Sequence, residues 1–253
     1  LYENRIPLNN STDFTFFKKD TIRLTPNYPY EIISEQFEQY QAVILSASVS
    51  FRPGQKYIQL PYSKISMGSK FPLFTLTFSK GIYGIFGSDV DFDKWKISVV
   101  GDKNFRLGGL LKYRGGLGGF LNNNKVIIQD YHHFNGNQSV VASEYVNSFQ
   151  LAQFYANSTI ASFFMYGNLE HHFNGLGTNK IPLFRRLNWN LVIGSNAFYV
   201  DRSNNYIEVF AGLENIIKIF RIDFVAAYNE GHQGTTGIRI GAGGLLGSSL
   251  KMN

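Results

Sequence analysis

The sequence predicts an all-β fold, a transmembrane antiparallel β-barrel, on three observations. Apolar and polar residues alternate with period two over segments of about eight to twelve residues, which Gly, Asn, Asp and Ser separate. No amphipathic helix longer than about two turns is visible. The polar faces carry Ser, Asn, Gly and isolated charges, and several apolar faces end in Trp, Tyr or Phe, as at membrane interfaces.

The clearest strand covers residues 219–229. Phe220, Ile222 and Phe224 fall on one face, whereas Arg221 and Asp223 fall on the other, because successive side chains of a strand point to opposite faces. In a barrel the apolar face is turned to lipid. The residues expected to face lipid are Trp189, Leu191, Ile193, Phe220, Ile222, Phe224, Ile238 and Ile240.

Composition narrows the class of protein. The chain has 253 residues, 24 of them basic and 18 acidic, and no cysteine, which excludes disulfides, thiolate zinc sites and cysteine nucleophiles. No uninterrupted apolar run reaches about 18 residues, so no transmembrane helix is expected. The positive charge is dispersed, which argues against nucleic-acid binding. A soluble β-sandwich, with its apolar faces inward, is the alternative architecture.

A long irregular stretch, about 119–157, interrupts the strands, and loops of this length are usually functional. The expected strands are about eleven and lie near 13–24, 42–52, 56–66, 72–80, 93–101, 105–117, 159–171, 187–199, 205–214, 218–229 and 236–246. Bacterial single-chain barrels have even strand numbers. We therefore expect residues 1–253 to be the C-terminal part of a single barrel domain, with further strands before them.

Five motifs carry a family resemblance: Gly118-Gly119-Phe120-Leu121, residues 129–138, Leu169-Glu170-His171-His172-Phe173, residues 180–187, and Gly237-Ile238-Arg239-Ile240-Gly241. Together they resemble the C-terminal barrel of a Bacteroidota outer-membrane family of unknown function. That family usually carries a carboxypeptidase-regulatory-like domain before the barrel, and it is distantly similar to the BamA/TamA-type insertase superfamily.

The resemblance implies a 16-stranded barrel in the bacterial outer membrane, with a long loop folded into the lumen and five strands after it. It implies a non-enzymatic role in assembly or insertion, or as a scaffold, without a cofactor. The implied partners are outer-membrane lipid, lipopolysaccharide and other outer-membrane or periplasmic proteins. In the insertases the tip of the loop carries Arg-Gly-aromatic, whereas here it reads Phe134-Asn135-Gly136-Asn137, which puts insertase activity in doubt.

We expect the loop tip to pack inside the barrel against charged residues of the last five strands, because charges in a confined lumen need partners. The tip comprises His132, His133, Phe134, Asn135, Gly136, Asn137 and Gln138. The charges expected in the lumen are Arg106, Lys112, Arg114, Glu170, Glu208, Glu214, Arg221, Asp223 and Arg239. Without such bracing, the same basic residues would suit a passive porin or transporter with a basic lumen, which is the alternative function.

Neither a metal site nor a catalytic site is expected. The string His-His-Phe-Asn-Gly occurs at 132–136 and again at 171–175, but its spacing matches no strong metal pattern. Asp130, either His132 or His133, and Ser139 could suggest a hydrolase, yet the sequence has no Gly-x-Ser-x-Gly elbow. The glycine-rich residues 115–119 lack the Lys and Ser/Thr of a phosphate loop.

Strand alternation also predicts an orientation. If the long loop starts and ends at the outer surface, the connections 172–186 and 214–217 are periplasmic. The connections 201–205 and 231–234 are then extracellular, and the C-terminus lies in the periplasm.

Overall fold

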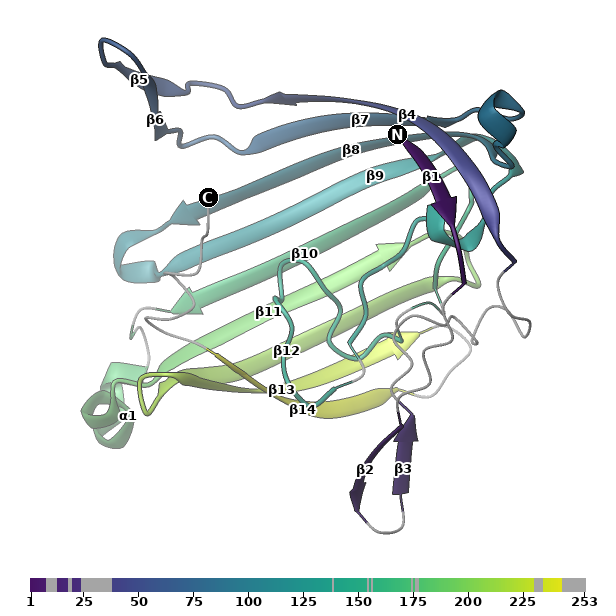
Figure 1. The fold of residues 1–253 in the computed structure, drawn as a ribbon. Coiled ribbons are helices and arrows are strands. Elements are labelled where there is room, and N and C mark those ends of the chain that lie inside the picture. The colour runs from purple at the N-terminus through teal and green to yellow at the C-terminus, as the bar shows by residue number, and fades with distance from the viewer. Residues whose placement is uncertain are drawn as a thin grey trace.

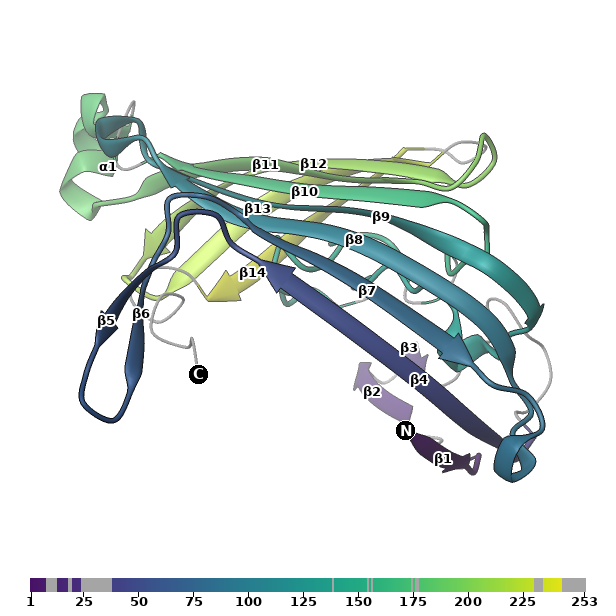
Figure 2. The ribbon, with the colours of Figure 1, turned by 90° about the horizontal axis from the view of Figure 1, so that it is seen from above.

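The computed structural model describes residues 1–7, 13–17, 20–23, 38–137, 139–153, 155, 157–173, 175, 178–229 and 234–242. These residues form an all-β fold dominated by one 10-stranded antiparallel sheet. The sheet is strongly curved, and Figures 1 and 2 show it as a trough. Among the described helices, none has the length and apolar character needed to cross a membrane.

The sheet order places β1 and β14 at its two edges, so the sheet is open. In order across the sheet, its strands are β1 (Tyr2–Arg5), β4 (Tyr40–Phe51), β7 (Leu73–Gly81), β8 (Asp91–Asn104), β9 (Leu110–Lys125), β10 (Phe164–Phe173), β11 (Asn190–Tyr199), β12 (Asn205–Ile216), β13 (Phe220–Asn229) and β14 (Thr235–Ala242). Within the described residues no second large sheet packs against it, which removes the β-sandwich alternative.

Two segments predicted as single strands of the sheet form separate hairpins. Segment 13–24 contains β2 (Asp13–Phe17) and β3 (Asp20–Arg23), and segment 56–66 contains β5 (Lys56–Gln59) and most of β6 (Lys64–Gly68). In the second hairpin, Pro61 lies in the turn, where the backbone N–H of Leu60 donates to the Ser63 carbonyl at 2.8 Å. Proline has no N–H for a ladder, so alternation cannot continue through it as one strand.

Several boundaries differ from those predicted. The glycine-rich β9 continues to Lys125, so the long loop covers 126–163 rather than 119–157. The helix α1 (Pro182–Leu187) replaces the start of the strand predicted from 187, because Pro182 occupies its first turn and Asn188 ends it at φ 53°. The short 3₁₀ turns are η1 (Ile85–Gly87), η2 (Arg106–Gly108), η3 (Ile128–Asp130) and η4 (Thr178–Lys180).

Two residues assigned from the alternation therefore lie elsewhere. Arg106 was expected to face the lumen, but it is exposed in η2, a turn between β8 and β9, with φ 59°. Trp189 was expected to face lipid from a strand, but it lies between α1 and β11, with its ring 5.6 Å from that of Phe184. In both cases a turn breaks the period-two pattern from which the assignment came.

The two faces of the sheet have opposite polarity. On the convex face, apolar side chains are exposed: Phe224 is 56% exposed and Leu76 is 50% exposed. On the concave face of β12 and β13, Glu208 and Asp223 are fully buried. The convex face also carries Leu191, Ile193, Phe220, Ile222, Ile238 and Ile240.

The antiparallel order sorts the connections into two ends of the sheet. The hairpin end comprises the connections 52–72, 105–109, 174–189 and 217–219, and β5, β6 and α1 lie there (Figure 1). The loop end comprises the connections 82–90, 126–163 and 200–204. The loop 126–163 folds back from its end onto the concave face (Figure 2).

Candidate functional site

An aromatic cluster holds the loop 126–163 against the concave face of β10–β13. The ring of Phe134 stacks on that of Phe198 in β11 with centroids 4.1 Å apart, and Phe149 meets both rings edge-on. Phe164 of β10 and Tyr206 of β12 complete the same buried cluster. Since each buried aromatic side chain removes a large apolar area from water, this cluster contributes strongly to the hydrophobic stabilisation of the loop.

Glu208 of β12 is the polar centre of the contact between loop and sheet. Its carboxylate accepts hydrogen bonds from the backbone N–H groups of Gln150, at 2.7 Å, and Leu151, at 3.1 Å. The side chains of Asn196, at 2.7 Å, and Tyr206, at 2.8 Å, also donate to it. A carboxylate with no solvent exposure thus obtains four donors, two of them from the loop.

The guanidinium of Arg239 in β14 holds the same loop segment from the other side. Its Nε donates to the backbone carbonyl of Gln150 at 2.8 Å. The peptide backbone of Gln150 therefore donates to a carboxylate of β12 and accepts from a guanidinium of β14. This pairing fixes the loop segment in register with two strands.

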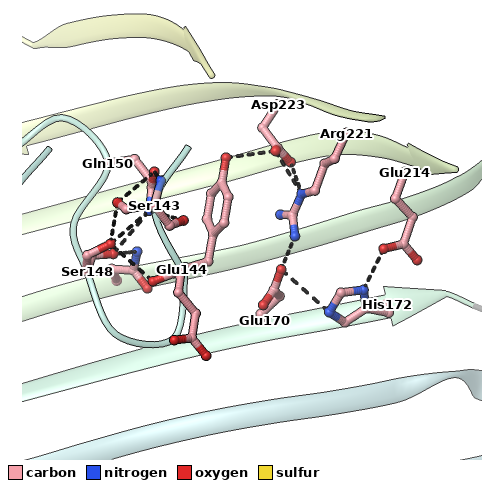
Figure 3. Close-up of polar contacts among 11 residues, drawn as sticks. Ser143, Glu144, Ser148, Gln150, Glu170, His172, Glu214, Arg221 and Asp223 are labelled. Atoms are coloured by element: carbon pink, nitrogen blue, oxygen red, sulfur yellow. Dashed lines mark hydrogen bonds and ion pairs between the residues drawn. The ribbon is translucent and has the colours of Figure 1, made fainter. Parts of the chain in front are cut away.

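A second polar cluster is centred on Arg221 of β13 (Figure 3). Its Nε donates to both oxygens of Asp223, at 2.9 and 2.7 Å, and its Nη1 donates to Glu170 of β10. From the loop, the hydroxyl of Tyr145 donates to Asp223 at 2.7 Å, and its ring lies 4.1 Å from the guanidinium carbon. A Cβ at residue 212 would lie 2.1 Å from the Asp223 carboxylate, so Gly212 makes room for it.

The cluster extends toward the hairpin end through His172. Its Nδ1 lies 2.9 Å from Glu214 and its Nε2 lies 3.5 Å from Glu170, so the imidazole bridges two carboxylates (Figure 3). Lys112 of β9 lies directly opposite Glu170 in the register, and Arg114 lies opposite Asn168. Acidic and basic groups are therefore interleaved on the concave face.

The loop also contacts both edges of the sheet. At the first edge, Arg5 of β1 forms a two-pronged pair with Asp130, with N–O distances of 2.9 and 3.1 Å. At the other edge, Ile240 of β14 accepts from Ala142 N–H at 2.8 Å and donates to the Val140 carbonyl at 2.9 Å. The loop therefore spans the trough from β1 to β14 and occupies part of the free edge of β14.

The predicted tip makes different contacts from those expected. His132 stacks on Phe164, with centroids 3.7 Å apart, and Asn137 donates to the Val141 carbonyl at 2.8 Å. A Cβ on Gly136 would lie 2.3 Å from the carbonyl oxygen of Ala152, so this position requires glycine. His133 and Asn135 bond within the loop, and Gln138 lies outside the described residues.

Three of the charged strand residues expected to meet the tip, Glu208, Asp223 and Arg239, are contacted by other loop residues. These are Tyr145, Gln150 and Leu151, which the sequence did not single out. One signal was present: Tyr145, Phe149 and Leu151 are bulky apolar residues in a segment without strand alternation. Such residues are usually buried in a folded protein. These three residues indicated that one face of the loop is buried, but they did not indicate which strand residues it contacts.

Burial keeps the two loop histidines neutral. It lowers the pKa of His132 to about 2, with additional lowering by the charges of Lys94 and Lys96. Burial, and then Lys94, also lowers the pKa of His133. Burial, and then Asp223, raises the pKa of the Tyr145 hydroxyl, which therefore remains a hydrogen-bond donor.

The residues considered for a hydrolase do not assemble into a triad. The hydroxyl of Ser139 donates to the side chain of Asn137 at 2.8 Å, and Asp130 is engaged by Arg5. Nδ1 of His133 instead lies 2.7 Å from the hydroxyl of Ser158. In the part of the chain that the structure describes, no group of three or more His, Asp or Glu residues could hold a metal ion.

Glu208→Ala tests whether this carboxylate holds the loop. Removal of the carboxylate leaves buried donors of Gln150, Leu151, Asn196 and Tyr206 unpaired, so loop docking should weaken by about 2–4 kcal/mol. Faster protease cleavage within 139–151 would report this loss. Glu144→Ala, which removes an exposed loop carboxylate, is the matched control and should leave cleavage unchanged.

Acid should release the loop through His132. Because its pKa is lowered in the folded protein, the open state binds more protons, and the stabilisation is lost as pH falls below about 6.5. Loop protection against protease should fall by up to about tenfold per pH unit between pH 6.5 and 5. His132→Phe keeps the ring stacked on Phe164 and should make this fall shallower, with the remaining part due to His133; an identical pH profile would exclude His132 as a source.

A comparison with known protein families shows the family of the chain. The profile of the C-terminal domain of a family of unknown function, DUF5686, matches residues 1–213, which cover β1 to most of β12. No curated protein matches the chain.

Proposed function

The chain belongs to the DUF5686 family, and we propose that it forms the wall of a non-enzymatic bacterial outer-membrane β-barrel whose lumen is closed by the loop 126–163. In this proposal the barrel is an assembly, insertion or scaffold component of an outer-membrane protein complex. The observation that carries it is the reversed polarity of the sheet: exposed apolar side chains on the convex face and buried charges on the concave face.

The convex face is too extensive and too apolar for ordinary solvent exposure. Exposed apolar side chains continue along successive strands, whereas the largest apolar patch on a soluble monomer is usually a few hundred Å². Facing lipid, the same side chains would be favourably placed. Those exposed on the convex face include Leu45, Val49, Leu76, Phe78, Ile97, Leu117, Met165, Leu169, Ile193, Ile207, Val209, Ile222, Phe224, Ile238 and Ile240.

The docked loop supports a closed lumen rather than an open one. It is held by Glu208, by Asp223 and by both edges of the sheet, which together resist its displacement. The five strands after the loop support the proposed distant relation to BamA/TamA-type insertases. The Asn135-Gly136-Asn137 tip departs from their arginine-bearing tip, so we favour a scaffold or assembly role without insertase chemistry.

A passive porin is a second candidate, and one observation favours it. On the concave side of β4, the hydroxyl side chains of Ser46, Ser48 and Ser50 are exposed, and they bond to hydroxyls of β7 rather than to the loop. A hydroxyl-lined wall is compatible with a water-filled lumen. The conductance of the intact protein separates the two candidates.

Adjacent substitutions on β7 test which face meets lipid. Leu76→Arg puts a charge on the convex face and should cost roughly 2–4 kcal/mol if it lies near the bilayer midplane. Thr75→Arg, at the same depth on the concave face and opposite Ser50 and Ser98, should cost much less. Equal costs in a vesicle-refolding titration would contradict the assignment of the two faces.

Excision of the plug should open the pore. The N–H of Asn137 donates to the carbonyl of Ala152 at 3.0 Å, so the ends of the excised segment lie close enough for a short glycine linker to replace residues 139–151. We expect small conductance for the intact protein in planar bilayers and a large, stable conductance for the excised variant.

Asn147→Ala, a substitution within the same segment that leaves the contacts to the strands intact, is the control and should behave as the intact protein. A large, stable conductance of the intact protein would contradict the closed lumen and favour the porin.

A further inference from the structure

Charge is distributed unevenly between the two ends of the sheet. The connections at the hairpin end, 52–72, 105–109, 174–189 and 217–219, contain no acidic residue. Their basic residues are Arg52, Lys56, Lys64, Lys70, Arg106, Lys180, Arg185, Arg186 and Lys218. The connections at the loop end carry Asp89, Asp130, Glu144 and Asp201, with Arg202 as their one basic residue. One end of the sheet is therefore strongly positive and the other is weakly negative.

Three of these cations converge beside α1. Lys180, Arg185 and Arg186 line an open hollow of about 450 Å³ together with Pro182. Within the described residues, no carboxylate forms an ion pair with any of the three. Like charges held together without a counter-charge repel, so this arrangement is suited to an anion from outside the chain.

Exposed apolar side chains adjoin the cations of α1. Leu183, which is 59% exposed, Ile181 and Leu187 flank Arg185 and Arg186 on the same short segment. An exposed element that carries both side-chain types is suited to an interface between water and hydrocarbon. The apolar groups can enter the acyl region while the guanidinium groups remain at the level of the headgroups.

The β5–β6 hairpin repeats this composition at the same end of the sheet (Figure 1). It carries Lys56 and Lys64 among exposed apolar residues, with Tyr62 fully exposed at its turn and Met67 exposed on β6. At its base, Arg52 lines an open cavity of about 460 Å³, and its Nε is buried without a hydrogen-bond partner among the described residues. A second element thus combines cations with exposed apolar side chains, and a guanidinium Nε at its base lacks a partner among the described residues.

We propose that the hairpin end is a docking surface for a leaflet of anionic phospholipid. The phosphate of one headgroup occupies the hollow formed by Lys180, Arg185 and Arg186, and the β5–β6 hairpin lies along the same leaflet. Guanidinium groups bind phosphate oxygens through two parallel hydrogen bonds, and clustered cations near a membrane act together. This inference rests on the proposed function, since it requires the convex face to lie in a bilayer.

The mixture of cationic and exposed apolar side chains on α1 and on the β5–β6 hairpin favours lipid over an acidic protein partner. Two elements separated by more than a hundred residues carry the same mixture and lie at the same end of the sheet. A membrane surface contacts both at once, because it extends around the whole barrel. The acidic connections of the loop end make the opposite end unsuited to the same surface.

The test uses the full-length protein in nanodiscs with a fluorophore on a single cysteine, in a background without other cysteines. Leu183→Cys reports on α1, and Leu76→Cys reports on the convex face. The lipid is phosphatidylglycerol or phosphatidylcholine with bromine both near the glycerol, to quench at position 183, and near the chain ends, to quench at position 76. We expect quenching at position 183 to be several-fold stronger with phosphatidylglycerol, and quenching at position 76 to occur with either lipid.

Charge removal should abolish the preference. With Lys180→Gln, Arg185→Gln and Arg186→Gln combined, the phosphatidylglycerol preference at position 183 should fall to about one, since each cation contributes up to about fivefold. Arg202→Gln at the loop end is the matched control and should keep the preference. Folding of the triple variant is verified by unchanged quenching at position 76.

The outcomes separate the two proposals. Equal quenching by both lipids at position 183, with normal quenching at position 76, overturns lipid docking and leaves the barrel intact. No quenching at position 76 overturns the proposed function itself. A preference that an excess of inorganic phosphate abolishes identifies a free-anion site and also overturns the phospholipid assignment.

Discussion

The fully buried carboxylate of Glu208 is the constraint on which the path of the loop depends. A carboxylate removed from water needs donors for its lone pairs, and β11 and β12 supply only Asn196 and Tyr206. The backbone N–H groups of Gln150 and Leu151 complete the set. Because these two residues are held there, the preceding loop residues are brought over the aromatic cluster and the Arg221 cluster. The aromatic contacts add stability, whereas the hydrogen bonds determine where the loop lies.

The same loop connects the two edges of the open sheet. It is fastened to β1 through Arg5 and Asp130, and to β14 through the backbone of Ile240. In a large twisted sheet with two free edges, the hydrogen bonds between strands do not by themselves fix the curvature. An exposed edge can also pair with a strand of another chain. By joining the edges across the trough, the loop holds the curvature and covers part of the β14 edge. Removal of the loop therefore affects the curvature of the sheet as well as the contacts on its concave face.

Period-two alternation predicted correctly which face of each strand is apolar. A shift of the strand by one residue would move every side chain to the opposite face, so the alternation constrains the faces strongly. It placed Phe224 on one face of β13 and Arg221 and Asp223 on the other, as the structure has them. It could not predict that segment 56–66 is a hairpin, since alternation does not reveal the partner of a strand. Arg106 was misplaced because the residues of this turn happen to continue the apolar–polar alternation, although Arg106 itself has a positive φ and belongs to no strand. The contacts of Tyr145 and Gln150 join residues more than fifty positions apart, and such contacts leave no periodic signal.

The location of the charges also bears on the choice between a scaffold and an anion-conducting porin. From sequence alone, a net charge of +6 with basic residues on inward faces is compatible with a basic lumen. In the structure, Arg221 is engaged by Glu170 and Asp223, and Arg239 is engaged by the Gln150 carbonyl, so neither is free to attract a passing anion. The largest group of cations lies in the connections of the hairpin end, which contain no acidic residue. Interleaved, mutually satisfied charges require a fixed geometry, which suits a plugged wall; an anion pathway needs unpaired cations along its length.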